Sequence, residues 1–208
     1  MKTKKTNRYG NGLKKFGLCA FTAALISVNV CQPYIYPVYA DDVQEESSAQ
    51  AEIETMYIST VDDFLEFAAN CYIDSWSVNK KIVLRNNLDF TGRELVMVPV
   101  FAGEFDGNGH TISGIDFTGE SYVTAIFRYV EENGVIDSLN VKGNIAALDE
   151  QECVGGIVGS NYGTIKNCSF EGTVNGKNTI GGIAAFNKST GVIKKCEVRG
   201  RITGSYYT

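Results

Sequence analysis

His110 is the single histidine of the 208-residue chain, and it limits the catalytic reactions open to the protein. A zinc-peptidase helix with the HExxH pattern needs two histidines, so this chain contains none. A Ser-His-Asp triad could be drawn from His110, Ser113 and a nearby aspartate, but no serine lies in the glycine pattern of a nucleophile elbow. We therefore interpret His110 as a residue of a turn and predict that the chain is not an enzyme.

Glu104, Asp106 and Asn108 place oxygen-bearing side chains at alternate positions ahead of a glycine, as in the opening of an EF-hand calcium loop. The rest of that loop is missing, because an isoleucine stands where the bidentate acid would be. We favour a tight turn in which Gly107 and Gly109 supply positive φ angles and the Asp and Asn side chains bond their own backbone. The three polar residues remain weak candidates for metal ligands, and no cofactor is predicted.

Polysaccharide lyases with a β-helix combine clustered acids that bind Ca²⁺ with a Lys or Arg that removes a proton. The candidate bases near the C-terminus have few acids beside them in sequence: Lys166, Lys194, Lys195, Arg199 and Arg201. Their alternation along strands favours an ordinary solvated face over a lyase site. The lyase hypothesis stays open, because sequence does not show which residues meet across neighbouring coils.

Three aromatic residues fall in connections between the expected strands: Tyr122, Tyr162 and Phe186. Aromatic side chains on the loops of a rigid scaffold can stack on sugar rings, although packing over a loop is their commoner use. We treat these three as candidate ligand contacts.

An internal repeat supplies the elements that would position all of these residues. GVIDSLNVKGNI begins at Gly134, GTIKNCSFEGTV at Gly163 and GVIKKCEVRGRI at Gly191. In register, equivalent positions hold Ile136/Ile165/Ile193, Leu139/Cys168/Cys196, Val141/Phe170/Val198, Gly143/Gly172/Gly200 and Ile145/Val174/Ile202. Because one apolar face recurs with glycine at a fixed corner, the pattern predicts an all-β fold, a right-handed parallel β-helix (β-solenoid).

A short helix is expected ahead of the first coil, at about residues 60–72. Its apolar residues recur at helical spacing: Val61, Phe64, Leu65, Ala68, Ala69 and Tyr72. Thr60 is a suitable N-cap, and two aspartates follow in the first turn, where the helix dipole favours negative charge. An open solenoid end is an aggregation hazard, so we expect this helix to cap the N-terminal end.

The repeats resemble those of the GLUG-motif proteins, which are bacterial secreted or surface chains. Members share β-helical repeats with the N-terminal regions of some IgA1-cleaving zinc metallopeptidases and adhesins. The resemblance rests on FAGEFDGNGHTISGI (101–115), AIFRYVEENGVIDSLNVKG (125–143), GGIVGSNYGTIKNCSFEG (155–172) and GGIAAFNKSTGVIKKCEVRG (181–200), with GLUG-type repeats over about 124–204. Arg128 and Ala185 depart from it, because glycine is usual at those positions. The resemblance implies a surface or secreted module rather than a reaction.

The N-terminus reads as a signal peptide, residues 1–40. Six basic and no acidic side chains lie in the first fifteen residues, an apolar run spans Phe16 to Val30, and Ala40 suits cleavage. An uncleaved anchor is the less favoured alternative. Residues 41–56 are rich in acids and predict a disordered spacer, and residues 57–208 form the β-helix.

Cleavage after Ala40 leaves 13 basic and 24 acidic side chains, a net charge of −11. Such a charge disfavours nucleic acid and anionic membrane surfaces as partners. Four cysteines also remain: Cys71, Cys153, Cys168 and Cys196. A bridge between Cys168 and Cys196 on adjacent rungs would satisfy disulfide geometry, but their apolar position favours buried free thiols.

Two functions fit these observations. The first is a non-catalytic secreted or cell-surface scaffold that binds an extracellular glycan or a host or cell-surface protein. The second is the N-terminal positioning module of a larger secreted polysaccharide-active enzyme or peptidase. The repeats reach Thr208 without an evident cap, so we also expect either edge-to-edge self-association at the C-terminal coil or further chain.

Overall fold

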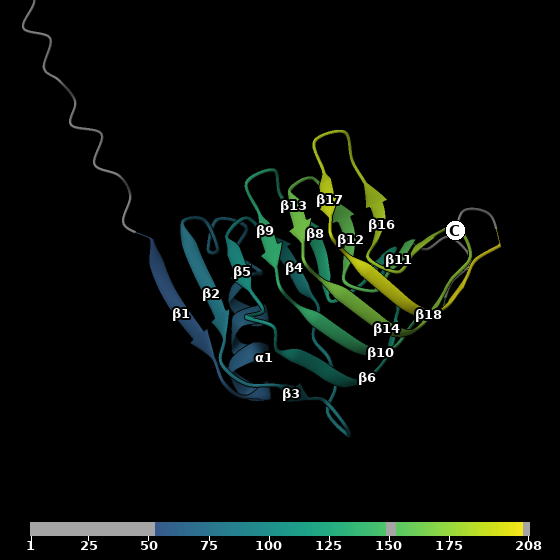
Figure 1. Cartoon of the computed structure of the whole chain (residues 1–208), viewed down its shortest axis with the longest axis horizontal. Helices are drawn as coiled ribbons and strands as arrows, with labels where there is room; N and C mark the ends of the chain where they lie inside the picture. Colours follow the sequence, from purple (N-terminus) through teal and green to yellow (C-terminus); the bar gives the residue numbers. More distant parts are fainter. Residues whose placement is uncertain (1–52, 149–152, 206–208) are drawn as a thin grey trace, which may run out of the picture. The chain divides into compact units, whose positions relative to one another are not determined.

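The computed structural model describes residues 53–148 and 153–205, which form a β-solenoid of about 5 turns with one short helix. Every strand pairs in parallel with its neighbours, and each complete coil adds one strand to each sheet (Figure 1). The predicted all-β solenoid is confirmed. The predicted signal peptide, residues 1–40, lies outside the described residues.

Four parallel sheets, here named A to D, form the walls of the solenoid. Sheet A contains β1 (Glu54–Ile58), β2 (Lys80–Leu84), β5 (Glu104–Asp106), β9 (Val135–Asp137), β13 (Thr164–Lys166) and β17 (Val192–Lys194). Sheet B contains β3 (Leu88–Asp89), β6 (Thr111–Gly119), β10 (Asn140–Ala147), β14 (Ser169–Asn175) and β18 (Glu197–Thr203). Sheet C contains β4 (Val98–Phe101), β8 (Phe127–Val130), β12 (Val158–Asn161) and β16 (Ala184–Asn187), and sheet D contains β7 (Val123–Thr124), β11 (Cys153–Gly155) and β15 (Thr179–Gly181).

Residues at equivalent positions of the sequence repeats lie side by side in the structure and form rows through the core. Ile136, Ile165 and Ile193 pair in sheet A, and the columns of Val141 and Ile145 pair in sheet B. Inner members of these rows are buried, so each apolar residue rests on its equivalent in the neighbouring coil. The alignment of the three repeats is therefore confirmed, and stacking of like on like explains why the pattern recurs.

A glycine row marks a bend in sheet B. Gly143, Gly172 and Gly200 have φ angles of 157°, 145° and 145°. A Cβ on Gly172 would lie 1.8 Å from the carbonyl oxygen of Gly143. The backbones of adjacent coils thus approach too closely here for any side chain.

The turn after β5 differs from its prediction in one respect. Gly109 and Asn108 have positive φ angles, of 74° and 51°, whereas Gly107 does not. Gly107 is needed for another reason, because a Cβ there would lie 2.5 Å from the Cα of Leu139 in the next coil. The predicted Asp106 bond is present, with the Asn108 N–H donating to Oδ1 at 2.8 Å.

Helix α1 (Val61–Asn70) begins where the sequence predicts. Thr60 Oγ1 accepts from the N–H of Asp63 at 3.1 Å, and the Asp63 carboxylate accepts from the N–H of Thr60 at 2.9 Å. This reciprocal capping box satisfies backbone donors that the helix leaves unpaired. The bonds from Ser59 and Thr60 also lower the pKa of the Asp63 carboxyl. Phe64 and Phe67 pack from the helix into the aromatic core, so α1 covers the N-terminal end of the apolar interior.

Strand β1 corrects the predicted boundary of the spacer. The solenoid begins at Glu54, within the range 41–56 that the composition assigned to disorder. The polar sequence of this stretch concealed the strand, because β1 lies at an edge and only one side of it is buried. Met56 packs against the core, and Glu54 forms an ion pair with Lys80 of β2.

The last coil leaves apolar side chains exposed. Ile193 is 37% exposed and Val198 is 40% exposed, whereas their equivalents one coil earlier, Ile165 and Phe170, are fully buried. The cause is that the last described coil has a neighbouring coil on one side only. Among the described residues, no helix is long and apolar enough to span a bilayer.

Candidate functional site

The structure brings together two of the three predicted aromatic contacts. Tyr162 follows β12 at the corner between sheets C and A, as predicted, whereas Phe186 lies within strand β16 and not in a connection. The ammonium group of Lys188 lies 4.2 Å from the ring centroid of Phe186 and 5.8 Å from that of Tyr162. One cation therefore contacts two aromatic faces.

Hydrogen bonds between the coils hold the corner that presents Lys188. The Asn161 Nδ2 donates to the Asn187 Oδ1 at 2.8 Å, and the Asn187 Nδ2 donates to the carbonyl of Gly191 at 2.8 Å. The N–H of Lys188 donates to the carbonyl of Asn161 at 2.9 Å. Asn161 is fully buried, so the position of this corner is set by the scaffold rather than by solvent.

A second aromatic residue shares the row of Phe186 in sheet C. Tyr129, Ser160 and Phe186 occupy paired positions on β8, β12 and β16. Adjacent strands lie about 4.8 Å apart, so the two rings flank Ser160 at a separation of about 10 Å. Ser160 is 3% exposed, whereas the aromatic residues on either side are half-buried and stand outside the apolar core of the described residues.

Arg128 adds another cation beside this row. Its guanidinium carbon lies 5.2 Å from the ring centroid of Tyr129, and its Nε is buried without a hydrogen-bond partner. Within residues 53–148 and 153–205, neither Arg128 nor Lys188 belongs to an ion pair. We name the set Arg128, Tyr129, Tyr162, Phe186 and Lys188 the aromatic–cation surface.

Tyr122, the third predicted contact, precedes β7 and is 58% exposed. Its pKa is raised chiefly by the charge of the neighbouring Cys153 side chain and by a hydrogen bond with it, and to a smaller extent by Tyr129. The N–H of Cys153 donates to the carbonyl of Tyr122 at 2.8 Å, which places Tyr122 beside Cys153.

Sequence reasoning missed Arg128, Tyr129 and Lys188 as members of a site. In the sequence, Arg128 stands out only as a departure from glycine. A signal was available, because aligning FRYV, VGSN and AAFN places Tyr129 and Phe186 in one column. The contact between Lys188 and Tyr162 had no such signal, since it joins a turn to a different coil.

Two of the three weak candidates for metal ligands, Glu104 and Asp106, form ion pairs with Lys81. Lys81 Nζ lies 2.8 Å from Glu104 Oε1 and 3.5 Å from Asp106 Oδ2, and the bond with Glu104 raises the pKa of this lysine. Asn108 Nδ2 donates to the carbonyl of Leu84 at 3.3 Å. Lys81 occupies the space between the two carboxylates, and no group of three potential ligands forms among the described residues.

Two of the five candidate lyase bases are paired with acids. Lys166 lies 3.0 Å from Asp137, and Arg199 lies 2.8 Å from Glu197. Partial burial opposes ionisation of Asp137, but bonds from Asn167, Lys166 and Ser138 lower its pKa. The remaining three bases, Lys194, Lys195 and Arg201, are exposed on the last coil.

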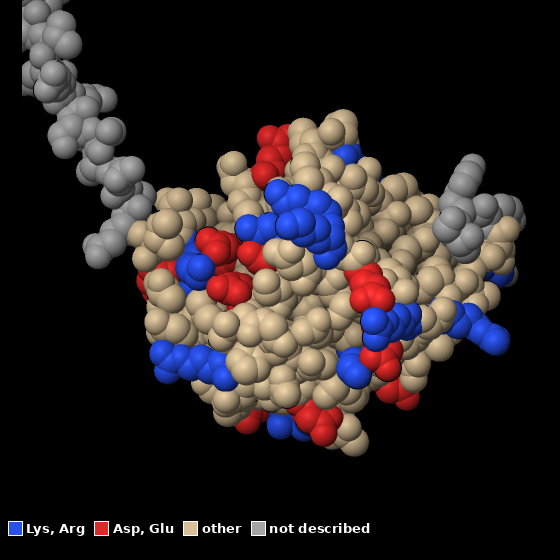
Figure 2. Space-filling model, viewed as in Figure 1, with Lys and Arg blue, Asp and Glu red and all other residues tan. Residues whose placement is uncertain are grey.

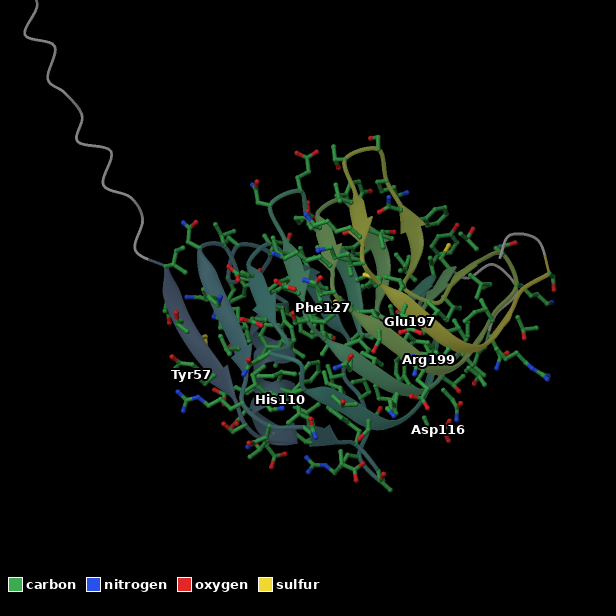
Figure 3. All side chains as sticks on the ribbon, viewed as in Figure 1. Tyr57, His110, Asp116, Phe127, Glu197 and Arg199 are labelled. Carbon is green, nitrogen blue, oxygen red and sulfur yellow. The ribbon has the colours of Figure 1, made fainter. Side chains whose placement is uncertain are left out.

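His110 lies in the turn before β6 (Figure 3). Its backbone N–H donates to the carbonyl of Gly107 at 2.8 Å, and its own carbonyl accepts from the N–H of Asn140 at 3.1 Å. The hydroxyl of Ser113 donates to the carbonyl of Leu88 at 3.2 Å. The serine is thus engaged with the backbone of the preceding coil.

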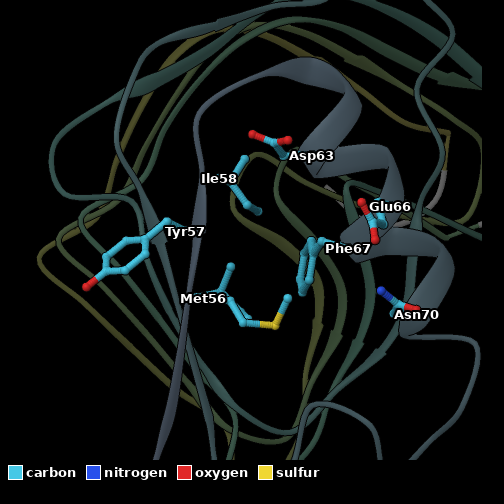
Figure 4. Close-up of a pocket in the computed structure, with 8 residues that line it drawn as sticks. Met56, Tyr57, Ile58, Asp63, Glu66, Phe67 and Asn70 are labelled. Carbon is cyan, nitrogen blue, oxygen red and sulfur yellow. The ribbon is translucent and has the colours of Figure 1, made fainter.

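A small cavity of about 100 Å³ lies between β1 and α1 (Figure 4). Its lining includes Met56, Tyr57, Glu66 and Asn70. Pockets for small molecules usually measure about 300–1,000 Å³, so this one is too small for a sugar ring. A hollow of about 350 Å³ at the corner near Glu131 and Glu132 has no aromatic lining.

Among the described residues no cysteine forms a disulfide, and Cys71, Cys153 and Cys168 are buried. Burial raises the pKa of Cys71 and of Cys168 to about 12. Cys196 is only partly buried, because it belongs to the open last coil. The preference for free thiols over a Cys168–Cys196 bridge agrees with this arrangement.

We expect iodoacetamide at pH 8 to modify Cys196 in the native protein well before Cys71 or Cys168. A rise in thiol pKa from 9 to about 12 leaves about 1,000-fold less thiolate at this pH, and burial also blocks the reagent. Peptide mass spectrometry after timed labelling measures the rates. Equal labelling of Cys168 and Cys196 in the folded protein would contradict the prediction.

The fold and the site define a β-solenoid repeat protein with an aromatic surface on one wall. A family model described as the GLUG motif matches residues 150–175. Residues 150–175 therefore contain a GLUG motif, as the repeats predicted.

Two curated proteins illustrate the likeness. Halomucin of Haloquadratum walsbyi is 38% identical over 95 residues, which cover 45% of this chain and 1% of halomucin. A protein of Evansella cellulosilytica named as a Gly-rich membrane protein is 35% identical over 74 residues, which cover 34% of this chain and 8% of that protein. The chain thus spans a small part of the length of these relatives. No solved structure matches it.

Proposed function

We propose that the chain is a non-catalytic module of a secreted or cell-surface protein, and that its aromatic–cation surface binds an acidic glycan. In this proposal residues 1–40 direct export. The coils wind right-handed, as parallel crossover connections almost always do. The names of the relatives, halomucin and a Gly-rich membrane protein, support a surface location.

The observation that carries the proposal is the position of Lys188 over the rings of both Phe186 and Tyr162. Aromatic faces stack on the apolar faces of sugar rings, and cations bind the carboxylate or sulfate groups of acidic sugars. Arg128 repeats the combination beside Tyr129. Because neither cation has an acidic partner within the described chain, both are available to a ligand anion.

The surface lies on regular strands and a hydrogen-bonded corner. Tyr129 and Phe186 are fixed by the parallel register of sheet C, and Lys188 by its bond to Asn161. A site that is rigid before binding loses little conformational entropy when the ligand arrives. This favours specific binding of an extended chain along the row.

Phe186→Ala is expected to weaken binding of an acidic polysaccharide by about 10-fold to 30-fold, because truncating a central aromatic contact costs about 2 kcal/mol. Lys188→Gln should weaken binding of the same polysaccharide and reduce its salt dependence. The measurement is titration calorimetry of the purified chain with polygalacturonate and hyaluronan as acidic probes and dextran as the neutral probe.

Tyr72→Ala is the matched control, since Tyr72 is 70% exposed in the loop after α1. It should leave binding unchanged. Circular dichroism confirms that each variant is folded. Unchanged affinity in a folded Phe186→Ala variant, or equal affinity for dextran and the acidic probes, would contradict the proposal.

A second function keeps a specific support, that of a positioning module in a larger secreted enzyme. The chain covers 1% and 8% of the two relatives, so such modules occur within much longer proteins. Glycan binding by the aromatic–cation surface would serve that role as well.

A further inference from the structure

The aromatic side chains on the outer face of sheet C recur at every second coil. Paired positions on β4, β8, β12 and β16 hold Val100, Tyr129, Ser160 and Phe186 in order. None of the four belongs to the apolar core of the described residues. A ring therefore alternates with a side chain that has none. Neighbouring coils lie beside this row and not over it, so the alternation is a property of the wall itself.

The charged side chains of this wall follow the same period of two coils. Residues 95–103, around β4, and residues 153–163, around β12, contain no Asp, Glu, Lys or Arg. On β8 the guanidinium carbon of Arg128 lies 5.2 Å from the ring centroid of Tyr129. Just beyond β16 the ammonium group of Lys188 lies 4.2 Å from that of Phe186. Each ring of the row thus has its own cation, and the strand between the two rings has neither.

The turns between sheets C and A alternate in length as well. Two residues connect β4 to β5 and β12 to β13, whereas four residues connect β8 to β9 and β16 to β17 (Figure 1). The same bond closes both longer turns. The N–H of Gly134 donates to the carbonyl of Glu131 at 2.8 Å, and the N–H of Gly191 donates to the carbonyl of Lys188 at 2.9 Å. The backbone of the wall therefore repeats after two coils, as its side chains do.

The cations of this wall differ from those of sheets A and B in their pairing. Figure 2 shows the face that sheets A and B form, where acidic and basic side chains lie next to one another. Lys142 lies there 2.9 Å from Glu171, and Lys166 lies 3.0 Å from Asp137. Arg128 and Lys188 have no such acidic partner among the residues that the structure describes. An anion of a ligand can therefore neutralise each of them.

An extended polysaccharide that runs along the solenoid axis would match this period. Two coils measure about 10 Å, and two linked pyranose rings of an extended chain cover nearly the same length. Alternate sugars can then stack on Tyr129 and Phe186, with their anionic groups at the neighbouring cations. The sugar between them lies over Ser160, where a charge would lose water without gaining a partner.

Glu131 adds to this discrimination. It is exposed at the corner, two residues beyond Tyr129, and no ion pair holds it among the described residues. Its charge repels any anion that lacks a cation of its own. The wall thus favours a ligand with as many anions as it offers cations.

We propose that the aromatic–cation surface selects alternating acidic glycans, in which one sugar of each disaccharide carries a carboxylate or sulfate, and that the glycan runs along the solenoid axis. This inference rests on the proposed binding of acidic glycans and adds the direction of the glycan and its charge pattern. A glycan charged on every sugar is the disfavoured ligand.

Titration calorimetry of the purified chain with oligosaccharides of defined length tests the charge pattern. The hyaluronan tetrasaccharide carries a carboxylate on alternate sugars, and tetragalacturonate carries one on every sugar. We expect the hyaluronan tetrasaccharide to bind at least about tenfold more tightly in the same buffer. A surface that only attracts charge would prefer tetragalacturonate.

Equal or tighter binding of tetragalacturonate would overturn this inference and leave the binding of acidic glycans intact. Binding of neither oligosaccharide would overturn the proposed function together with the inference. Both comparisons use the unmodified chain, so they do not depend on the folding of a variant.

The length of the ligand tests the two-coil spacing. A tetrasaccharide reaches both rings of the row and a disaccharide only one, so the hyaluronan tetrasaccharide should bind at least about tenfold more tightly than the disaccharide. Tyr129→Ala should abolish this difference, because one ring remains on the row. Tyr72→Ala, in the loop after α1, is the matched control and should keep the difference. Full length dependence in a Tyr129→Ala variant that circular dichroism shows to be folded would overturn the axial path.

Discussion

Gly172→Ala is expected to lower the free energy of unfolding by about 4 kcal/mol, since an unfavourable φ costs about 1–3 kcal/mol and overpacking a further 1–3. Gly172 has a φ of 145°, and its Cβ would meet the carbonyl oxygen of Gly143 at 1.8 Å. The same position lies against Gly200 in the next coil, where the corresponding approach is also 1.8 Å. Neither neighbour can move without breaking the pairing of sheet B.

Gly92→Ala separates backbone strain from the clash. Gly92 also has a positive φ, of 71°, but a Cβ added to it would have no other atom within 4 Å. This control should cost about 1–2 kcal/mol, the strain of a left-handed conformation alone. Urea unfolding followed by circular dichroism measures both variants. Equal losses for Gly172→Ala and Gly92→Ala would contradict the close-approach explanation.

Phe67→Ala is expected to lower the free energy of unfolding by about 3–5 kcal/mol, the usual cost of removing a buried aromatic ring. Phe67 is 2% exposed and joins α1 to the solenoid. Its ring centroid lies 5.7 Å from Phe105, 5.8 Å from Phe101 and 6.4 Å from Phe127. The substitution would leave a cavity among strands of sheets A and C.

The fluorescence of Trp76 shows which part of the molecule loses stability in Phe67→Ala. Trp76 is the single tryptophan, and its ring centroid lies 6.1 Å from that of Phe67. In Phe67→Ala, its fluorescence should change at a lower urea concentration than the circular dichroism of the strands, as the helical cap opens first. Tyr72→Ala, on an exposed residue just beyond α1, should shift neither transition. A loss below about 1 kcal/mol for Phe67→Ala would show that α1 does not stabilise the end of the core.

Most of the fold could be predicted from the sequence, because a solenoid repeats its contacts at the period of its chain. The columns of Ile136, Val141 and Ile145 became rows of the core, and the glycine column became the close contact of sheet B. The helix and its N-cap were equally readable, since capping and helical periodicity are local properties. Strand β1 was not, because an edge strand buries too little to show an apolar pattern.

The candidate site was predicted only in part. Tyr162 was identified by type and by its place in a connection, and Phe186 by type alone, because it lies on β16. Lys188 and Arg128 were identified as partners only by their distances to aromatic rings. For Glu104 and Asp106 the sequence suggested a ligand that the structure does not favour. Their spacing resembled a calcium loop, but Lys81 of the neighbouring coil forms ion pairs with both carboxylates.

The sequence by itself determined that this protein is a β-solenoid with GLUG-type repeats, because apolar residues that recur at a fixed period must stack on one another to be buried. Only the tertiary structure decided which side chains of different coils meet at a corner. Those contacts depend on how sharply the backbone bends between sheets and on the lateral spacing of strands, and neither quantity is encoded in the period of the repeat.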